Sequence, residues 1–304
     1  MAVAYLQPKE YVRSVPQDGV AYSRAEALEY TRWLATHHYE NFHVVSFLLP
    51  KKLHRDFYNV YSYCRWADDL GDEMGDPAES LRLLGWWRSE LRAMYRGEAA
   101  HPVFVALKET VARYAIPLET FDRLIRAFEQ DQRITRYNTW QEVFDYCANS
   151  ANPVGHLVLY LCGYGDAERQ RLSDYTCTAL QLANFWQDIT VDLKKGRVYL
   201  PLDLLAEHSY TVDELFAGEA NSRFRAVMRD AVAVADDLFH KGLPLIKTVN
   251  RRLSLDLALF SRGGLKILQK IRDHDYDVLQ QRPCISKAER AGILLQCLPQ
   301  LLAF

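Results

Sequence analysis

The sequence of 304 residues predicts an all-α protein. Nearly every segment spaces its apolar residues at the period of a helix, and no alternation of apolar and polar residues persists long enough to indicate a sheet. No linker, low-complexity tract or internal repeat divides the chain. Residues 1–304 are therefore expected to form a single domain of about ten helices.

Capping signals mark the helices of the first half. Ser23 and Glu26 have the spacing of a capping box, and the helix that they open is predicted to reach about Thr36. Pro77 suits the first position of a helix that ends near Gly97. The other predicted helices of this half span residues 55–73, 102–114 and 118–132.

The second half is predicted to hold longer helices. Asp166 is expected to cap a helix that continues to Lys195, with Gly196 just beyond its end. Pro153 interrupts the pattern of another helix, so a kink is expected there, serving either as a simple bend or as a source of unpaired backbone groups. The predicted spans are 139–161, 166–195, 221–248, 254–281 and 286–303.

Composition narrows the class of protein. Apolar residues make up 49% of the chain and charged residues 25%, which is ordinary for a soluble globular protein. A net charge of −2 gives no general attraction to nucleic acid, so no nucleic-acid partner is expected. The six cysteines form no CxxC pair and are expected to be reduced core residues of a cytoplasmic protein.

Membrane signals are weak. The N-terminus lacks a cationic region followed by an apolar run, and no uninterrupted apolar stretch is long enough to span a bilayer. Residues 293–304 are apolar but broken by Gln296, Pro299 and Gln300. They are predicted to form a last helix that packs on the body of the protein, with peripheral contact with the inner membrane as the alternative.

Two acidic clusters are the strongest functional signal. The first holds Asp68 and Asp72, and the second holds Asn184, Asp188 and Asp192. Spacing by four residues puts like charges on one helical face, which destabilises a helix by about 0.2–0.5 kcal/mol per pair. Mg²⁺ would offset that repulsion, because it is held by one or two carboxylates together with substrate phosphates. We expect the clusters to face one another across a cavity; a solvated acidic helix face is the alternative.

Basic and aromatic residues accompany the clusters. Arg65 lies one turn before Asp68, and Lys194, Lys195 and Arg197 follow Asp192. These cations could hold diphosphate oxygens that the metal does not reach, or simply pair with neighbouring acids along the helix. Most nearby aromatic residues are expected in the core and a few beside a developing carbocation: Tyr39, Phe42, Tyr61, Tyr63, Trp66, Tyr146, Phe185, Trp186 and Tyr199.

Three segments together resemble the squalene/phytoene synthase family, whose members join or process isoprenoid diphosphates. Residues 61–73, YSYCRWADDLGDE, resemble its first aspartate-rich motif. Residues 181–192, QLANFWQDITVD, with KGRVYLP over 195–201, resemble the second. Residues 146–155, YCANSANPVG, occupy the place of its Tyr-Cys…Ala-Gly-x-Val-Gly helix. The order and spacing extend over about residues 35–290, which is most of the chain.

The resemblance implies a fold and a set of roles. The fold is the all-α isoprenoid synthase bundle with a central cavity. The implied Mg²⁺ ligands are Asp68, Asp72, Asn184, Asp188 and Asp192, which also form the catalytic set together with Tyr146. The implied contacts with the isoprenoid diphosphate substrate are Asn41, Tyr61, Arg65, Ala151, Gln181, Lys195, Arg197 and Tyr199.

Departures from the family pattern indicate which branch of the family the sequence resembles. Asn152-Pro153 replaces Gly-x, Tyr39–Phe42 replaces Ser-x-Ser-Phe, and Gln187 stands where an arginine often precedes the middle aspartate. A tyrosine common in the penultimate helix is replaced within Arg262–Leu265. These choices resemble the bacterial hopanoid-pathway branch, which takes presqualene diphosphate and adds water after diphosphate has left. An upstream presqualene diphosphate synthase and a downstream hydroxysqualene reductase are the expected functional partners.

Other functions stay open. The nearest is head-to-head condensation of two farnesyl diphosphates to presqualene diphosphate, squalene or phytoene. A nicotinamide-dependent reduction is a second, although no nucleotide-binding motif supports it. A helical assembly protein that kept only the fold is a third, and it is disfavoured because all five acidic-cluster ligands are present. For water capture, the hypothesis is that Asn152 and freed backbone groups at the Pro153 kink bind one water molecule.

Overall fold

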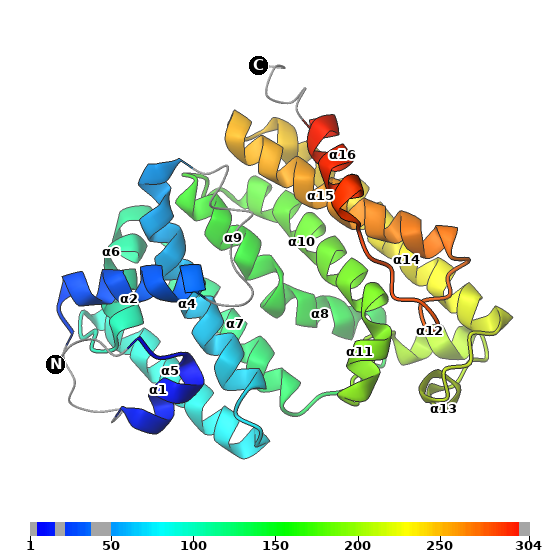
Figure 1. The fold of residues 1–304 in the computed structure, drawn as a ribbon, viewed down its shortest axis with the longest axis horizontal. Coiled ribbons are helices and arrows are strands. Elements are labelled where there is room, and N and C mark those ends of the chain that lie inside the picture. Colours follow the sequence, from blue (N-terminus) through cyan, green and yellow to red (C-terminus); the bar gives the residue numbers. More distant parts are fainter. Residues whose placement is uncertain (1–4, 16–21, 38–49, 298–304) are drawn as a thin grey trace. The chain divides into compact units, whose positions relative to one another are not determined.

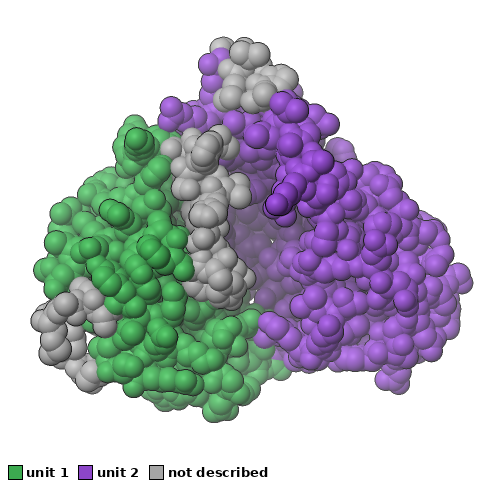
Figure 2. Space-filling view, viewed as in Figure 1, with its two compact units in different colours: residues 1–133, 156–165 green, residues 134–155, 166–304 purple. Residues whose placement is uncertain are grey.

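The computed structural model describes residues 5–15, 22–37 and 50–297, and helices dominate these ranges (Figure 1). The chain forms two compact units, coloured separately in Figure 2. Unit 1 comprises residues 1–133 and 156–165, and unit 2 comprises residues 134–155 and 166–304. The predicted all-α class is confirmed, whereas one domain over residues 1–304 stays a prediction.

Unit 1 is built around an aromatic core. Trp66 of α4 stacks on Trp87 of α5 with ring centroids 5.0 Å apart, and Tyr63 meets Phe121 of α7 edge-on. Both tryptophans are fully buried, so this aromatic packing holds α4 against α5. The helices of this unit are α1 (Pro8–Ser14), α2 (Arg24–His37), α4 (Lys51–Asp72), α5 (Pro77–Arg96), α6 (Pro102–Tyr114) and α7 (Leu118–Asp131).

Unit 2 is organised by the long helix α10. It packs against α14 and α15, and Trp186 near its end donates from Nε1 to the carbonyl of Ala231 at 3.1 Å. The elements of this unit are α8 (Trp140–Ser150), α10 (Ala167–Gln187), α11 (Ile189–Lys194), α12 (Leu202–Glu207), α13 (Val212–Phe216), α14 (Ser222–Gly242), η1 (Leu243–Lys247), α15 (Arg251–Asp273) and α16 (Lys287–Cys297). Helix α9 (Asn152–Leu161) begins in unit 2 and ends in unit 1.

Most predicted helix ends are confirmed. The backbone N–H of Ser23 donates to Glu26, and that of Glu26 donates to the Ser23 hydroxyl, as a capping box requires. Pro77 opens α5, and Gly97 closes it with a φ of 96°, a left-handed conformation that glycine adopts readily. Asp166 caps α10 by accepting from the N–H of Arg169.

Several predicted spans differ from the structure. The helix predicted over 166–195 breaks at Asp188, which has φ −108° and ψ 15°, just before the β-branched run Ile189–Val191. The helix predicted over 139–161 divides at Ala151 into α8 and α9. The helix predicted to reach residue 281 ends at Asp273, because Asp275 and Tyr276 adopt positive φ. The short helices α1, α12 and α13 were not predicted.

The cysteines are free thiols, as expected. Cys147 and Cys297 are buried, whereas the expectation that all six lie in the core is wrong for Cys284, which is exposed in the segment after α15. Burial raises the pKa of the Cys64 thiol to about 12, so it stays protonated. Among the described residues, none of the helices combines the length and apolar character needed to cross a membrane.

Candidate active site

The first acidic cluster lies at the end of α4 and contains a buried arginine. Arg65 is only 6% exposed and pairs through Nη1 with Asp68 at 2.9 Å and through Nη2 with the buried Asp69. The Asp68 side chain is 38% exposed, and Asp72, the last residue of α4, is exposed. Arg65 therefore orients Asp68 and offsets part of the repulsion between neighbouring carboxylates. Tyr61 lies one turn earlier on the helix and is half-buried.

The second cluster surrounds the break between α10 and α11. Asn184, one turn before the break, donates from Nδ2 to Oδ2 of Asp188 at 3.0 Å. Asp188 lies between the last residue of α10 and the first residue of α11, where it caps both helices. The N–H of Asp188 still donates to the carbonyl of Asn184, and the N–H of Asp192 donates to the carbonyl of Asp188, so the three residues keep their one-turn spacing across the break.

Arg282 is a site residue that the sequence analysis missed. Its Nε donates to Oδ1 of Asp188, although 94 residues separate the two positions. Gln187 fixes this segment, because its Nε2 donates to the carbonyl of Pro283 at 2.6 Å. In the sequence, Arg282 directly follows the helix predicted over 254–281 and precedes Pro283, and neither feature indicates a contact with Asp188.

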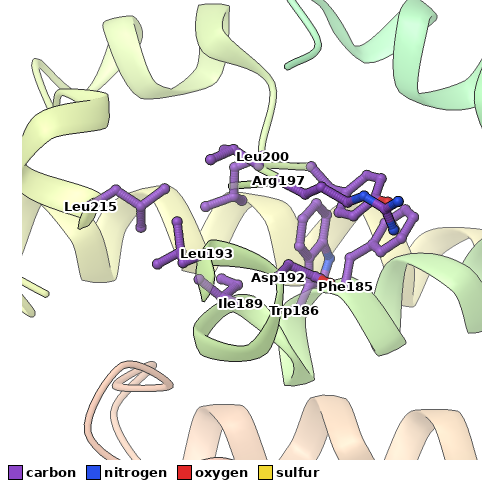
Figure 3. Close-up of a pocket in the computed structure, with 10 residues that line it drawn as sticks. Phe185, Trp186, Ile189, Asp192, Leu193, Arg197, Leu200 and Leu215 are labelled. Atoms are coloured by element: carbon purple, nitrogen blue, oxygen red, sulfur yellow. The ribbon is translucent and has the colours of Figure 1, made fainter. Parts of the chain in front are cut away.

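A third group of residues gathers where the chain returns after α11 (Figure 3). Val198 forms a parallel bridge with Arg136, and its N–H donates to the Thr135 carbonyl at 2.9 Å. This pairing fixes Tyr199, whose ring stacks on Phe185 of α10 at 3.7 Å with an angle of 4° between the planes. The ring centroid of Tyr146 of α8 lies 5.7 Å from that of Tyr199.

Asp192 and Arg197 line a small crevice beside this aromatic group. The crevice has a volume of about 10 Å³, which is close to the space of a single water molecule. Figure 3 shows both side chains together with Phe185 and Trp186. The structure thus brings together Tyr146, Arg197, Tyr199 and Asp192, four residues that the family resemblance had named.

The remaining predicted residues occupy varied positions. Lys195 is exposed at the end of α11, and Gln181 is half-buried on α10. Ala151 lies at the break between α8 and α9. Next to it, the buried Asn152 accepts at Oδ1 from the Thr178 hydroxyl at 3.0 Å, so its oxygen is held against α10. Asn41 and the segment Tyr39–Phe42 lie outside the described residues.

An apolar pocket adjoins the second cluster. It lies between α10 and α15, has a volume of about 330 Å³, and its lining includes Asn184 and Gln187. Arg290 of α16 also lines it, and most of the remaining wall is apolar, with Leu180, Leu259 and Ile267 among the contributors. A pocket of this size is within the range of small-ligand sites. Asn184 is itself a predicted metal ligand, and it donates a hydrogen bond to a second one, Asp188.

The donors of both clusters fit a hard cation in type, since all are carboxylate or amide oxygens. Within the described part of the chain, no three acidic, histidine or cysteine side chains lie close enough to hold a metal by themselves. Mg²⁺ is typically held by one or two protein carboxylates together with substrate phosphates and water, and its binding at these clusters stays a prediction. That the two clusters face one another across a central cavity stays a prediction.

Comparison with known proteins identifies the family. The profile described as "Squalene/phytoene synthase" matches residues 35–289, which covers most of the chain and the motifs of both units. The chain belongs to the squalene/phytoene synthase family. Members of this family act on isoprenoid diphosphates and generally use a divalent metal with them.

Among relatives in the family, a phytoene synthase of Thermus thermophilus is 33% identical over 258 residues, covering 84% of this chain and 87% of its own. A crystal structure of squalene synthase HpnC from Alicyclobacillus acidocaldarius is 44% identical with a TM-score of 0.80, covering 84% of this chain and 96% of that one. A dehydrosqualene synthase crystallised with a ligand shares the fold at 20% identity and a TM-score of 0.80, covering 92% of this chain and 98% of its own. The isoprenoid synthase helical fold is thereby confirmed.

Proposed function

We propose that this chain is a hydroxysqualene synthase of the hopanoid branch. It takes presqualene diphosphate, releases diphosphate and adds water to the rearranged carbocation. The single observation that carries the proposal is the 44% identity to squalene synthase HpnC over 84% of the chain. The departures from the family pattern, which are Asn152-Pro153, Gln187 and the glycines after Arg262, point to the same branch.

In this proposal, different residues of the site bind the metal, the diphosphate group and the rest of the substrate. Asp68, Asp72, Asn184, Asp188 and Asp192 would hold Mg²⁺ together with the diphosphate group. Bound there, Mg²⁺ would supply positive charge that stabilises diphosphate as a leaving group. Arg65, Lys195 and Arg197 would hold diphosphate oxygens, and the buried Arg65 also orients Asp68. The remaining predicted substrate contacts are Asn41, Tyr61, Ala151, Gln181 and Tyr199.

The proposed reaction begins with the loss of diphosphate and ends with the addition of water to a carbocation. The carbon–oxygen bond to diphosphate breaks with both electrons leaving on oxygen, and a cyclopropylcarbinyl cation remains on the lipid. The aromatic group of Tyr146, Phe185 and Tyr199 presents rings that can stabilise such a cation by about 0.5–2 kcal/mol each. After rearrangement, water forms a new carbon–oxygen bond and loses a proton, giving hydroxysqualene.

A second candidate is head-to-head condensation of two farnesyl diphosphates. The observation that favours it is the 33% identity to a phytoene synthase over 84% of the chain. The same ligands and cations would serve that reaction, since it also begins with the departure of diphosphate. The two candidates differ in which substrate the purified protein consumes alone.

The setting of the reaction is also part of the proposal. A water-insoluble lipid substrate suits a cytoplasmic enzyme that touches the inner membrane only peripherally. Leu294 and Leu295 of α16 are 44% and 65% exposed, and such apolar side chains support contact with a lipid surface. A presqualene diphosphate synthase would supply the substrate, and a hydroxysqualene reductase would consume the product.

Product analysis tests the proposal directly. Purified protein is incubated with Mg²⁺ and either presqualene diphosphate or farnesyl diphosphate, with and without reduced nicotinamide, and the lipids are identified by mass spectrometry. We expect hydroxysqualene from presqualene diphosphate without nicotinamide, and its oxygen to come from labelled water. Rapid consumption of farnesyl diphosphate alone would instead establish the condensing enzyme.

A further inference from the structure

The two adjacent glycines of α15, Gly263 and Gly264, differ in what surrounds them. A Cβ added to Gly264 would lie 2.1 Å from Cζ of Phe239, so the close packing of α15 on α14 requires a glycine there. A Cβ added to Gly263 would meet no heavy atom within 4 Å. Packing therefore explains Gly264 and does not explain Gly263.

Glycine at position 263 destabilises the helix, and no packing contact requires it. It lies inside the 23-residue helix α15, where glycine is among the poorest helix formers and alanine the best. Its φ does not lie in the left-handed region, so backbone conformation does not require glycine either. What the missing side chain does leave is space, because Gly263 lines the 330 Å³ pocket between α15 and α10.

The pocket has the polarity of a site for an amphiphile. Its polar groups come from Asn184 and Gln187 of α10 and from Arg290 of α16. Asn184 also donates a hydrogen bond to Asp188. The apolar wall comes from Leu180, Ala183, Leu259 and Ile267. A ligand with an anionic head near Asp188 and a hydrocarbon chain in the pocket matches this division.

Helix α16, which contributes Arg290 to the pocket wall, is anchored to α15. Glu289 of α16 accepts from Lys270 at 2.9 and 3.0 Å and pairs with Lys266 at 3.3 Å, so two cations of α15 hold the start of α16. Glu289 also closes the capping box with Ser286. A side chain introduced at position 263 would therefore take space from the ligand rather than push α16 away.

We propose that Gly263 sets the length of the hydrocarbon chain that this pocket accepts. The inference rests on the proposed function, because it takes the occupant to be the chain of an isoprenoid diphosphate. Alanine at position 263 would shorten the accepted chain slightly, and leucine would fill the pocket. Gly263 is in this sense a specificity-determining residue for the family reaction.

Binding measurements separate this inference from the proposed function. Wild type, Gly263→Ala and Gly263→Leu are titrated by calorimetry with Mg²⁺ and unreactive thio analogues of geranyl, farnesyl and geranylgeranyl diphosphate, and with inorganic pyrophosphate. Gly85→Leu is the matched control, because Gly85 of α5 also has open space around its Cβ but lies outside this pocket. Circular dichroism and melting temperature report folding, and Gly263→Ala should melt higher than wild type.

We expect Gly263→Leu to weaken binding of the farnesyl and geranylgeranyl analogues at least tenfold. Binding of the geranyl analogue and of pyrophosphate should stay within twofold of wild type, with Gly263→Ala intermediate and Gly85→Leu unchanged. An unchanged chain-length profile in folded Gly263→Leu and Gly263→Ala, or an equal loss for pyrophosphate, would overturn the inference while leaving the proposed function intact. Wild-type protein that binds pyrophosphate but none of the chains would overturn both.

Discussion

Arg282 donates from Nε to the carboxylate of Asp188, a residue predicted to bind Mg²⁺. The other oxygen of that carboxylate accepts from Asn184, so both oxygens of Asp188 have protein partners in this structure. A cation that binds Asp188 must therefore compete with the Arg282 guanidinium. The Asp188 side chain is 18% exposed and that of Arg282 is 46% exposed, so the competing ion pair is partly screened by water.

Replacing Arg282 should strengthen metal binding in the absence of substrate. In Arg282→Gln the competing charge is gone, and the affinity for Mn²⁺ alone, measured by electron paramagnetic resonance, should rise about two- to fivefold, as expected for an ion pair of up to about 1 kcal/mol. Arg272→Gln is the control, because Arg272 pairs with Asp236 at similar exposure away from the cluster. Equal or weaker Mn²⁺ binding by Arg282→Gln would contradict the competition.

Asp188 should be essential for turnover and dispensable for folding. Asp188→Ala removes a carboxylate that the proposed mechanism uses to hold the metal and diphosphate, so we expect activity on presqualene diphosphate to fall by about 100-fold or more. Helix content by circular dichroism should be unchanged, since Asp188 already lies at a helix break. Asp237→Ala, which removes an exposed carboxylate paired with Lys241, is the control. Retained activity in Asp188→Ala would remove this residue from the metal site.

Close helix packing predicts opposite effects for two Gly→Ala changes. A Cβ at Gly242 would lie 2.2 Å from Oγ1 of Thr176 and 3.0 Å from the Thr176 nitrogen, so Gly242→Ala should lower the free energy of unfolding by about 1–3 kcal/mol. Gly85→Ala meets open space inside α5 and should raise it by about 0.5–1 kcal/mol. Urea denaturation measures both. Loss of stability in both variants would show that helix propensity does not determine the effect at Gly85.

Local signals in the sequence predicted the helices well. Capping residues such as Ser23, Asp166 and Gly97 act on their own neighbours, so sequence spacing was enough to find them. The break at Asp188 was missed because helical periodicity continues through it. Arg282 was missed because it reaches Asp188 over 94 residues, a distance at which spacing carries no information about contact. Recognition of whole motifs, rather than periodicity, supplied Tyr146 and Tyr199.

The buried His101 should make the protein sensitive to mild acid. It caps α6 by accepting at Nδ1 from the N–H of Val103, while Trp66, Trp86 and Trp87 surround its ring edge-on. Burial holds its pKa well below the ordinary 6.5, so the unfolded state binds a proton that the folded state excludes. The stability that this provides is present above about pH 6.5 and is lost as the pH falls below that value.

His101→Asn tests this pH dependence. Asparagine can still cap α6 but does not titrate, so the free energy of unfolding should be lower at pH 8, where the ring contacts are lost, and should change less between pH 7 and pH 5. His240→Asn, at an exposed position of α14, controls for the loss of a histidine as such. A slope in His101→Asn equal to that of wild type would show that His101 does not titrate on unfolding.

Asp256 of α15 should have the opposite dependence on pH. Burial raises the pKa of its carboxyl from the ordinary 3.8 to about 7, so between these values the folded state holds a proton that the unfolded state releases. The stability associated with the protonated carboxyl is fully present below about pH 4 and is lost as the pH rises through about 7.

Asp256→Asn keeps the shape without the charge and should raise the melting temperature at pH 8.5 more than at pH 4.5. Asp273→Asn, at the exposed end of the same helix, is the control. If Asp256→Asn shifted the melting temperature equally at both pH values, the carboxyl would already be ionised in the folded protein.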